Sequence, residues 1–110
     1  MKYFCYDDER GGTCYHEFYK GKFDGVSFWK KDSIFIHDDI LCKLGMIDLF
    51  LSVIPRYDSL DETEVNKEQW DDIKNQAKAI GGNLFEAIEE ADIWVQETFL
   101  SHMVFTIIGI

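Results

Sequence analysis

The sequence contains a single proline among its 110 residues, and it has no serine- and glycine-rich run and no internal repeat. Linkers between domains are usually rich in such residues, so we expect one domain over residues 1–110. Hydrophobic residues make up 46% of the chain and aromatics 15%, which is enough to build a core and argues against disorder.

A long uninterrupted apolar run is also missing. The N-terminal segment MKYFCYDDER has no apolar core of the signal-peptide kind, and charged residues interrupt the longest apolar region, residues 40–54. Cys5, Cys14 and Cys42 are odd in number and form no CxxC pair, so neither a disulfide framework nor a zinc site is indicated. We expect a cytoplasmic protein in which these thiols are reduced and buried as small hydrophobic side chains.

Basic residues are scarce. Lys and Arg number 11 against 21 Asp and Glu, for a net charge of −10. The imbalance is uneven: residues 1–55 carry −2 and residues 56–110 carry −8. Such a field repels nucleic acids and anionic membranes, so we expect neither as a partner. It favours a basic protein partner, or simply solubility.

The first third of the chain is typical of β-strands. Residues 2–6, 13–19 and 25–29 are rich in aromatic and β-branched residues, with glycine-containing turns between them. Residues 33–36 are a fourth candidate. Together these segments predict an N-terminal antiparallel β-meander.

After residue 37 the period becomes helical. Apolar residues recur at steps of four and three, which predicts one largely buried helix with Asp38 as N-cap and an end at Pro55. The predicted inward stripe of this helix is Ile40, Leu44, Ile47, Leu51 and Ile54.

Two more helices are predicted downstream. Residues 56–65 have no apolar period and should form an exposed connection, after which Asn66 and Gln69 match a capping box. Glycines at 81–82 should end that helix, and Asn83 with Glu86 should cap the next. The predicted inward residues are Trp70, Ile73, Ala77 and Ile80 on the first helix, and Leu84, Ile88, Ala91, Val95 and Phe99 on the second.

Residues 102–110 form a nearly continuous apolar, β-branched run, which is typical of an interior strand. The sequence therefore predicts an α+β domain, with an N-terminal antiparallel β-meander, three helices and a C-terminal strand that returns to the sheet.

The densest charge lies in residues 57–73, YDSLDETEVNKEQWDDI, where seven carboxylates accompany only Lys67. Their spacing does not match an EF-hand loop and lacks its glycine. His16, His37 and His102 fall on separate predicted elements, which argues against zinc. We expect no metal ion and no cofactor.

Catalytic motifs are absent as well, since no GxSxG, P-loop, HExxH or dinucleotide-binding pattern occurs. His37 beside Asp38 and Asp39 is the best local acid–base cluster, although helix capping by Asp38 explains it more simply. Cys14 and Cys42 have no identifiable base. We expect no enzyme; a small enzyme using the His37 region is the remaining catalytic alternative.

The predicted strands are crowded with aromatic residues, and most of them should belong to the core. Alternation along a strand nevertheless places some on the opposite face, where exposed Tyr or Trp side chains commonly anchor interfaces.

An acidic loop that feeds a helix carrying Trp70 and Ile73, followed by the hydrophobic ending VFTIIGI, resembles the immunity proteins of bacterial toxin–immunity systems. The likeness is to those of contact-dependent growth inhibition and related polymorphic toxins, and it covers about the second half of the chain. It implies a stoichiometric antidote that binds a cognate toxin domain, often a basic nuclease, and covers its active site. It implies no catalytic residues.

On this interpretation, one group of carboxylates supplies the electrostatic part of the partner-binding surface. The alternative is a small acidic adaptor or regulatory subunit that binds another basic protein. The predicted partner-binding residues are Asp58, Asp61, Glu62, Glu64, Asp71 and Asp72.

Overall fold

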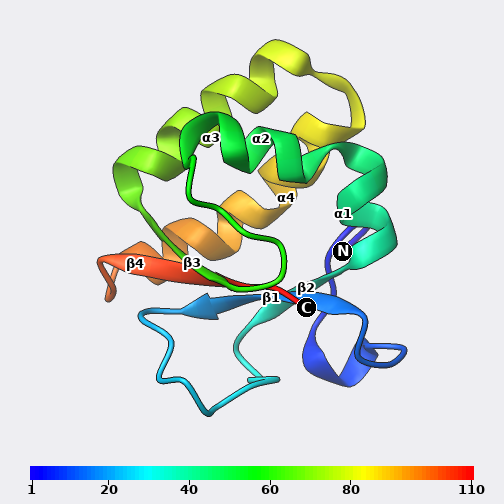
Figure 1. Ribbon diagram of the computed structural model, residues 1–110, viewed down its shortest axis with the longest axis vertical. Helices are drawn as coiled ribbons and strands as arrows, with labels where there is room; N and C mark the ends of the chain where they lie inside the picture. The colour runs from blue at the N-terminus through cyan, green and yellow to red at the C-terminus, as the bar shows by residue number, and fades with distance from the viewer.

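A four-stranded antiparallel sheet with the strand order β2-β1-β4-β3 organises the fold, as seen in a computed structural model that describes residues 1–110. Figure 1 shows the helices stacked on one face of this sheet, while two loop segments, residues 7–12 and 21–33, cross the other. The predicted α+β class is confirmed. The strands are β1 (Tyr15–Lys20), β2 (Ile34–His37), β3 (Glu62–Asn66) and β4 (Val104–Ile108).

The C-terminal strand lies inside the sheet, as its apolar run predicts. β4 pairs with β1 on one side and β3 on the other. Phe105 and Ile107 are fully buried in the core under the helices, whereas Thr106 and Ile108 face the loops on the opposite side. Both faces of β4 are therefore covered, which explains why its sequence shows no polar alternation.

The predicted meander was wrong in two of its four strands. Residues 2–6 contribute only an isolated bridge between Cys5 and Phe35, and residues 25–29 form a loop. That loop is held by carboxylates instead of a strand ladder. Asp24 accepts hydrogen bonds from the N–H groups of Val26 and Ser27. The Ser27 side chain, followed by these two N–H groups, lowers the pKa of Asp24 to about 2.

The long helix predicted before Pro55 is two helices, α1 (Asp38–Leu44) and α2 (Met46–Val53), so the structure has four helices instead of three. Gly45 separates them at φ 80°, a left-handed conformation that glycine adopts without strain. Of the predicted inward stripe, Ile54 is buried and Ile40, Leu44 and Ile47 are partly buried against the core, whereas Leu51 was wrong and is 39% exposed. The residues buried here are Leu41, Met46, Leu49, Phe50 and Ile54.

The third helix, α3 (Lys67–Ile80), begins as predicted. Asn66 accepts a hydrogen bond from the N–H of Gln69 at 2.8 Å, and the Gln69 side chain accepts one from the N–H of Asn66 at 2.9 Å. Trp70, Ile73 and Ala77 are buried as expected. Ile80 was predicted inward but is 64% exposed, because it is the last residue of the helix.

The fourth helix, α4 (Gly82–Phe99), starts one residue before its predicted cap. Gly81 is the N-cap, so Asn83 lies within the first turn and the predicted capping box does not form. Leu84, Ile88, Ala91 and Val95 are buried as predicted, and Phe99 is partly buried. None of the helices combines the length and hydropathy needed to cross a membrane.

The segment predicted as an exposed connection contains β3. Thr63 and Val65 are buried, while Glu62 is exposed and Glu64 half-exposed. This alternation has the strand period of two, but it spans too few residues to stand out in the sequence. β3 is an edge strand and pairs only with β4.

The prediction of buried thiols was wrong. Cys14 and Cys42 are exposed, and Cys5 is half-buried. Cys14 lies just before β1 at the end of the sheet, and Cys42 lies on the outer side of α1.

Candidate partner-binding surface

The six predicted carboxylates follow one another along the chain, from the turn before β3 through β3 into the first half of α3. Asp58 and Asp61 occupy the turn that enters β3, Glu62 and Glu64 lie on β3 itself, and β3 runs directly into α3. We call this set the acidic edge: Asp58, Asp61, Glu62, Glu64, Asp71 and Asp72.

The turn at the start of the acidic edge is fixed against the chain that follows β4. The N–H of Gly109 donates to the carbonyl of Asp61 at 2.8 Å, and that of Ile110 donates to the carbonyl of Ser59 at 3.1 Å. A β-carbon on Gly109 would lie 2.2 Å from the Ser59 oxygen, so only glycine allows this approach. The first two acids are thus held on an ordered backbone.

Most of the acidic edge has no basic partner in the fold. Glu64 approaches Lys22 at 3.9 Å and Asp71 approaches Lys74 at 3.8 Å, both long for ion pairs. The remaining four form no salt bridge: Asp58, Asp61, Glu62 and Asp72. The neighbouring Glu68 has none either. Their negative charge is therefore free to act on another molecule.

The acids of α4 have a different environment. The carboxylate of Glu90 accepts hydrogen bonds from the N–H groups of Lys2, Tyr3 and Phe4, at 2.8 to 2.9 Å. It therefore holds the N-terminal segment against the helix.

Other α4 acids pair with distant basic residues. Glu86 lies 3.1 Å from Lys2, and Glu97 lies 3.2 Å from Lys20. The hydrogen bond from Lys2 and the charge on its ammonium group lower the pKa of Glu86. These pairs could not be predicted from the sequence, because the partners lie far away in the chain.

Asp92 of α4 is also used within the fold. It accepts hydrogen bonds from the indole N–H of Trp70 at 2.8 Å and from Gln96 at 3.0 Å, and lies 3.4 Å from Lys74. Burial acts to raise the pKa of Asp92, but these donors and the Lys74 charge hold that pKa below its ordinary value. Asp92 therefore ties α3 to α4.

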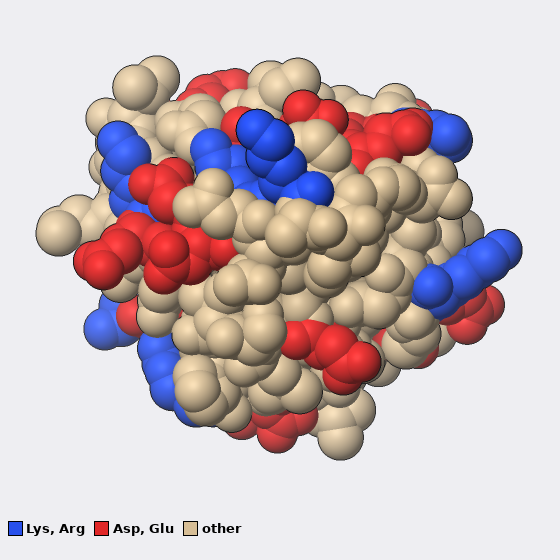
Figure 2. Space-filling view, turned by 90° about the horizontal axis from the view of Figure 1, so that it is seen from above, with Lys and Arg blue, Asp and Glu red and all other residues tan.

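The space-filling view from above shows that charge on this side of the molecule is divided. Asp and Glu gather in several separate groups, with neutral surface and Lys or Arg side chains between them (Figure 2). No single acidic patch covers this side, so net charge alone does not locate a docking surface. The pairing of each carboxylate is more informative.

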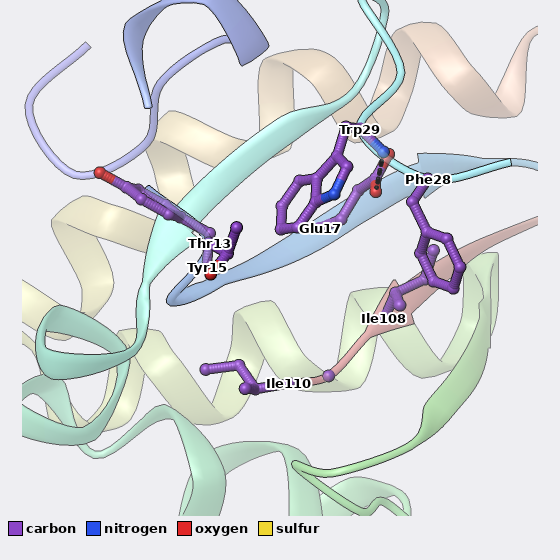
Figure 3. A pocket seen from close by; sticks show the side chains of 8 residues that line it. Thr13, Tyr15, Glu17, Phe28, Trp29, Ile108 and Ile110 are labelled. Carbon is purple, nitrogen blue, oxygen red and sulfur yellow. Dashed lines mark hydrogen bonds between the residues drawn. The ribbon is translucent and has the colours of Figure 1, made fainter. Parts of the chain in front are cut away.

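A pocket of about 170 Å³ opens on the sheet face opposite the helices. Figure 3 shows the side chain of Glu17 rising from β1 between Trp29 and Phe28, with Ile108 and Ile110 below. Glu17 was not among the predicted site residues. The signal that could have identified it is a carboxylate in the middle of TCYHEFY, a strand segment rich in aromatic residues. The residues around the pocket are Thr13, Tyr15, Glu17, Phe28, Trp29, Ile108, Gly109 and Ile110.

Glu17 is only 2% exposed and holds the loop above it. One carboxylate oxygen accepts a hydrogen bond from the N–H of Trp29 at 2.9 Å. The other accepts from the N–H of Lys30 at 3.1 Å and from the hydroxyl of Ser33 at 2.6 Å. Trp29 has φ 58°, a left-handed conformation uncommon for a bulky residue, and the Glu17 hydrogen bonds help to hold it there.

The pocket adjoins the acidic edge through the strand register. Ile108 of β4 is paired with Glu17 of β1 on one side and with Glu62 of β3 on the other. Directly opposite residues of antiparallel strands project to the same face. The buried carboxylate, the apolar pocket floor and an unpaired acid therefore lie in one row across the sheet.

The His37 region is built differently from its predicted form. His37, and not Asp38, caps α1, because its Nδ1 accepts the N–H of Asp39 at 3.0 Å. Asp38 instead lies 2.7 Å from Nε2 of the fully buried His16. Partial desolvation and then the Asp38 carboxylate raise the pKa of the Cys42 thiol, which makes it a weaker nucleophile.

The three main pockets lie away from that cluster. Besides the pocket over Glu17, hollows of about 520 Å³ and 230 Å³ lie near the N-terminal segment. None of the three is lined by His16, His37, Asp38 or Cys42. No group of three or more His, Cys, Asp or Glu side chains is placed so that it could ligate a metal ion.

Comparisons of the chain with protein-family models, with curated proteins and with solved structures find no match. The side chains of the acidic edge and of the adjoining pocket are therefore the basis for a functional assignment.

Proposed function

We propose that this protein is a cytoplasmic immunity protein that binds a cognate toxin domain and neutralises it. The toxin domain is a basic protein, and a nuclease is the kind that fits best. The acidic edge docks over its active site with one antidote per toxin. The protein supplies no catalytic group of its own to the complex.

The observation that carries this proposal is the unpaired state of the acidic edge. Four of its six carboxylates have no salt bridge within the fold, and the other two have only long ones. Like charges without counterions repel one another, and this repulsion lowers the stability of the folded state. A basic partner supplies counterions for these carboxylates, and for this reason we propose that the partner is basic.

A nuclease is favoured because of what its own active site must attract. A cleft that binds phosphates is positive, so a row of carboxylates can occupy it as the substrate's charge would. Opposite potentials raise the association rate toward ~10⁸–10⁹ M⁻¹s⁻¹. Fast capture is an advantage for an antidote to a toxin that is already inside the cell.

The test is coexpression with the product of the adjacent upstream gene, where the gene of a cognate toxin is expected. The two proteins should copurify at equal stoichiometry, and the antidote should abolish the toxin's activity at a one-to-one ratio. Copurification with a basic protein whose activity is unchanged would instead indicate the adaptor. If the neighbouring product does not bind, the immunity proposal is wrong.

A further inference from the structure

The carboxylate of Glu17 is buried without a counterion. All three of its hydrogen-bond donors are neutral: the N–H groups of Trp29 and Lys30, and the hydroxyl of Ser33. No Lys, Arg or His nitrogen forms a salt bridge with it. These donors stabilise the carboxylate and satisfy most of its hydrogen-bonding capacity, but no cation is paired with it.

One acceptor position of Glu17 also remains open. A carboxylate offers about four lone-pair positions, and here one oxygen accepts two hydrogen bonds and the other only one. Buried charges in proteins are normally paired, because removal from water is costly. A cationic donor can therefore fill the free acceptor position of Glu17 and pair with its negative charge.

The walls of the pocket suit a flat cation. Tyr15, Phe28 and Trp29 contribute aromatic side chains, and the faces of such rings attract ammonium and guanidinium groups. Within the fold, the guanidinium carbon of Arg10 already lies 3.7 Å from the centre of the Trp29 ring. Arg10 does not line the pocket, so the pocket itself contains no cation.

We propose that this pocket receives an arginine side chain of the basic partner, whose guanidinium stacks on the aromatic walls and donates toward Glu17. Arginine fits better than lysine because its planar group can stack and hydrogen-bond at the same time. This inference rests on the proposed function for the identity of the partner. The shared row of Glu17, Ile108 and Glu62 places the pocket beside the acidic edge, so one partner surface can engage both.

The pocket can be tested without the partner. Ethylguanidinium should shift the NMR signals of the Trp29 indole and of the Trp29 and Lys30 amides, with saturation in the millimolar range. Ethylurea has nearly the same shape but no charge, and it should leave them unchanged. Equal responses to the two compounds, or no response to ethylguanidinium, would overturn the proposal.

Variants in the loop provide a matched pair. Phe28 is 50% exposed, so Phe28→Ala removes one aromatic wall with little risk to folding, and it should weaken ethylguanidinium binding ~2–5-fold. Val26, in the same loop, is 76% exposed and does not line the pocket. Val26→Ala should therefore leave binding unchanged, and an equal loss in both variants would count against the pocket.

Measurements with the partner separate the failure of this inference from that of the proposed function. Phe28→Ala should speed dissociation of the complex ~2–5-fold while association changes little. A bound partner whose dissociation is unchanged in Phe28→Ala would refute the pocket and leave the immunity proposal intact. Selective ethylguanidinium binding in a protein that binds no toxin would support the pocket and refute the immunity proposal.

Discussion

Two groups of acids with similar composition have different environments in this protein. On α4, Glu86, Glu90, Asp92 and Glu97 each have a hydrogen-bond or ion-pair partner, and several of those partners belong to the N-terminal part of the chain. On the acidic edge the carboxylates have long ion pairs or none. Acids in the first group contribute to folding, whereas those in the second leave their charge available.

The comparison shows that charge density is a poor guide to function unless each charge is assigned a partner. Residues 56–110 carry a net charge of −8. The acids of α4 account for part of that charge, but most of them are paired within the fold. Substitutions that separate the two groups are therefore the most informative tests.

The largest effect is expected at Trp70, which joins the two regions. Its ring is fully buried in the core against Phe105, and its indole N–H donates to Asp92 of α4. Trp70→Ala should cost ~3–5 kcal/mol of unfolding free energy, because it leaves a cavity and removes one of the hydrogen bonds to Asp92. Urea unfolding measures this loss. A loss below ~1 kcal/mol would show that α3 and α4 do not depend on this contact.

The next effect is expected at Glu90. Glu90→Ala removes the acceptor for the N–H groups of Lys2, Tyr3 and Phe4, and should cost ~1–3 kcal/mol. The neighbouring Glu89 is exposed and has no partner, so Glu89→Ala should change stability by less than ~0.5 kcal/mol. Thermal melts of the two variants compare them directly. Equal losses would show that the α4 acids are not structurally distinct.

A smaller effect concerns pH. The pKa of Asp92 is lowered in the folded state, so its carboxylate stabilises the fold above the unfolded-state pKa of ~3.9. That contribution is lost as the pH falls from there through the folded-state value. Asp92→Asn should therefore flatten the decline in stability below about pH 4. Asp72→Asn is the control from the acidic edge. Melting temperatures measured between about pH 6 and pH 2.5 would contradict this if both variants kept the wild-type slope.

Local signals in the sequence predicted the parts of the fold that depend on neighbouring residues. The capping box of Asn66 and Gln69 needs only residues three apart, and the apolar run at 102–110 identifies β4 by itself. The break at Gly45 was missed because apolar residues continue at helical spacing across it. Residues 25–29 have strand-like composition, but Glu17 binds the backbone N–H of Trp29 and holds that segment as a loop.

The candidate site was predictable only in part. The acids of the acidic edge are adjacent in sequence, so their proximity on one segment could be expected. Whether each has a counterion depends on contacts such as Lys2 with Glu86, which join opposite ends of the chain. The Glu17 pocket depends on β1, β4 and the loop of residues 21–33 coming together, and no short motif encodes that arrangement.

The most direct measurement of the central claim compares two variants with the same change in net charge. One replaces Asp58, Asp61, Glu62 and Glu64 of the acidic edge with Asn or Gln. The other replaces four exposed acids outside it that have no ion pair, Asp8, Asp32, Asp48 and Glu89, in the same way.

Association with the cognate toxin should slow about ten-fold or more at low salt in the acidic-edge variant, and much less in the other. The difference should shrink at high salt, because screening over ~8–10 Å removes steering. Melting curves should show that the acidic-edge variant is as stable as the wild type, since exposed, unpaired acids add little to stability. Equal slowing in both variants at every salt concentration would contradict the account, because net charge and not the acidic edge would then guide the partner.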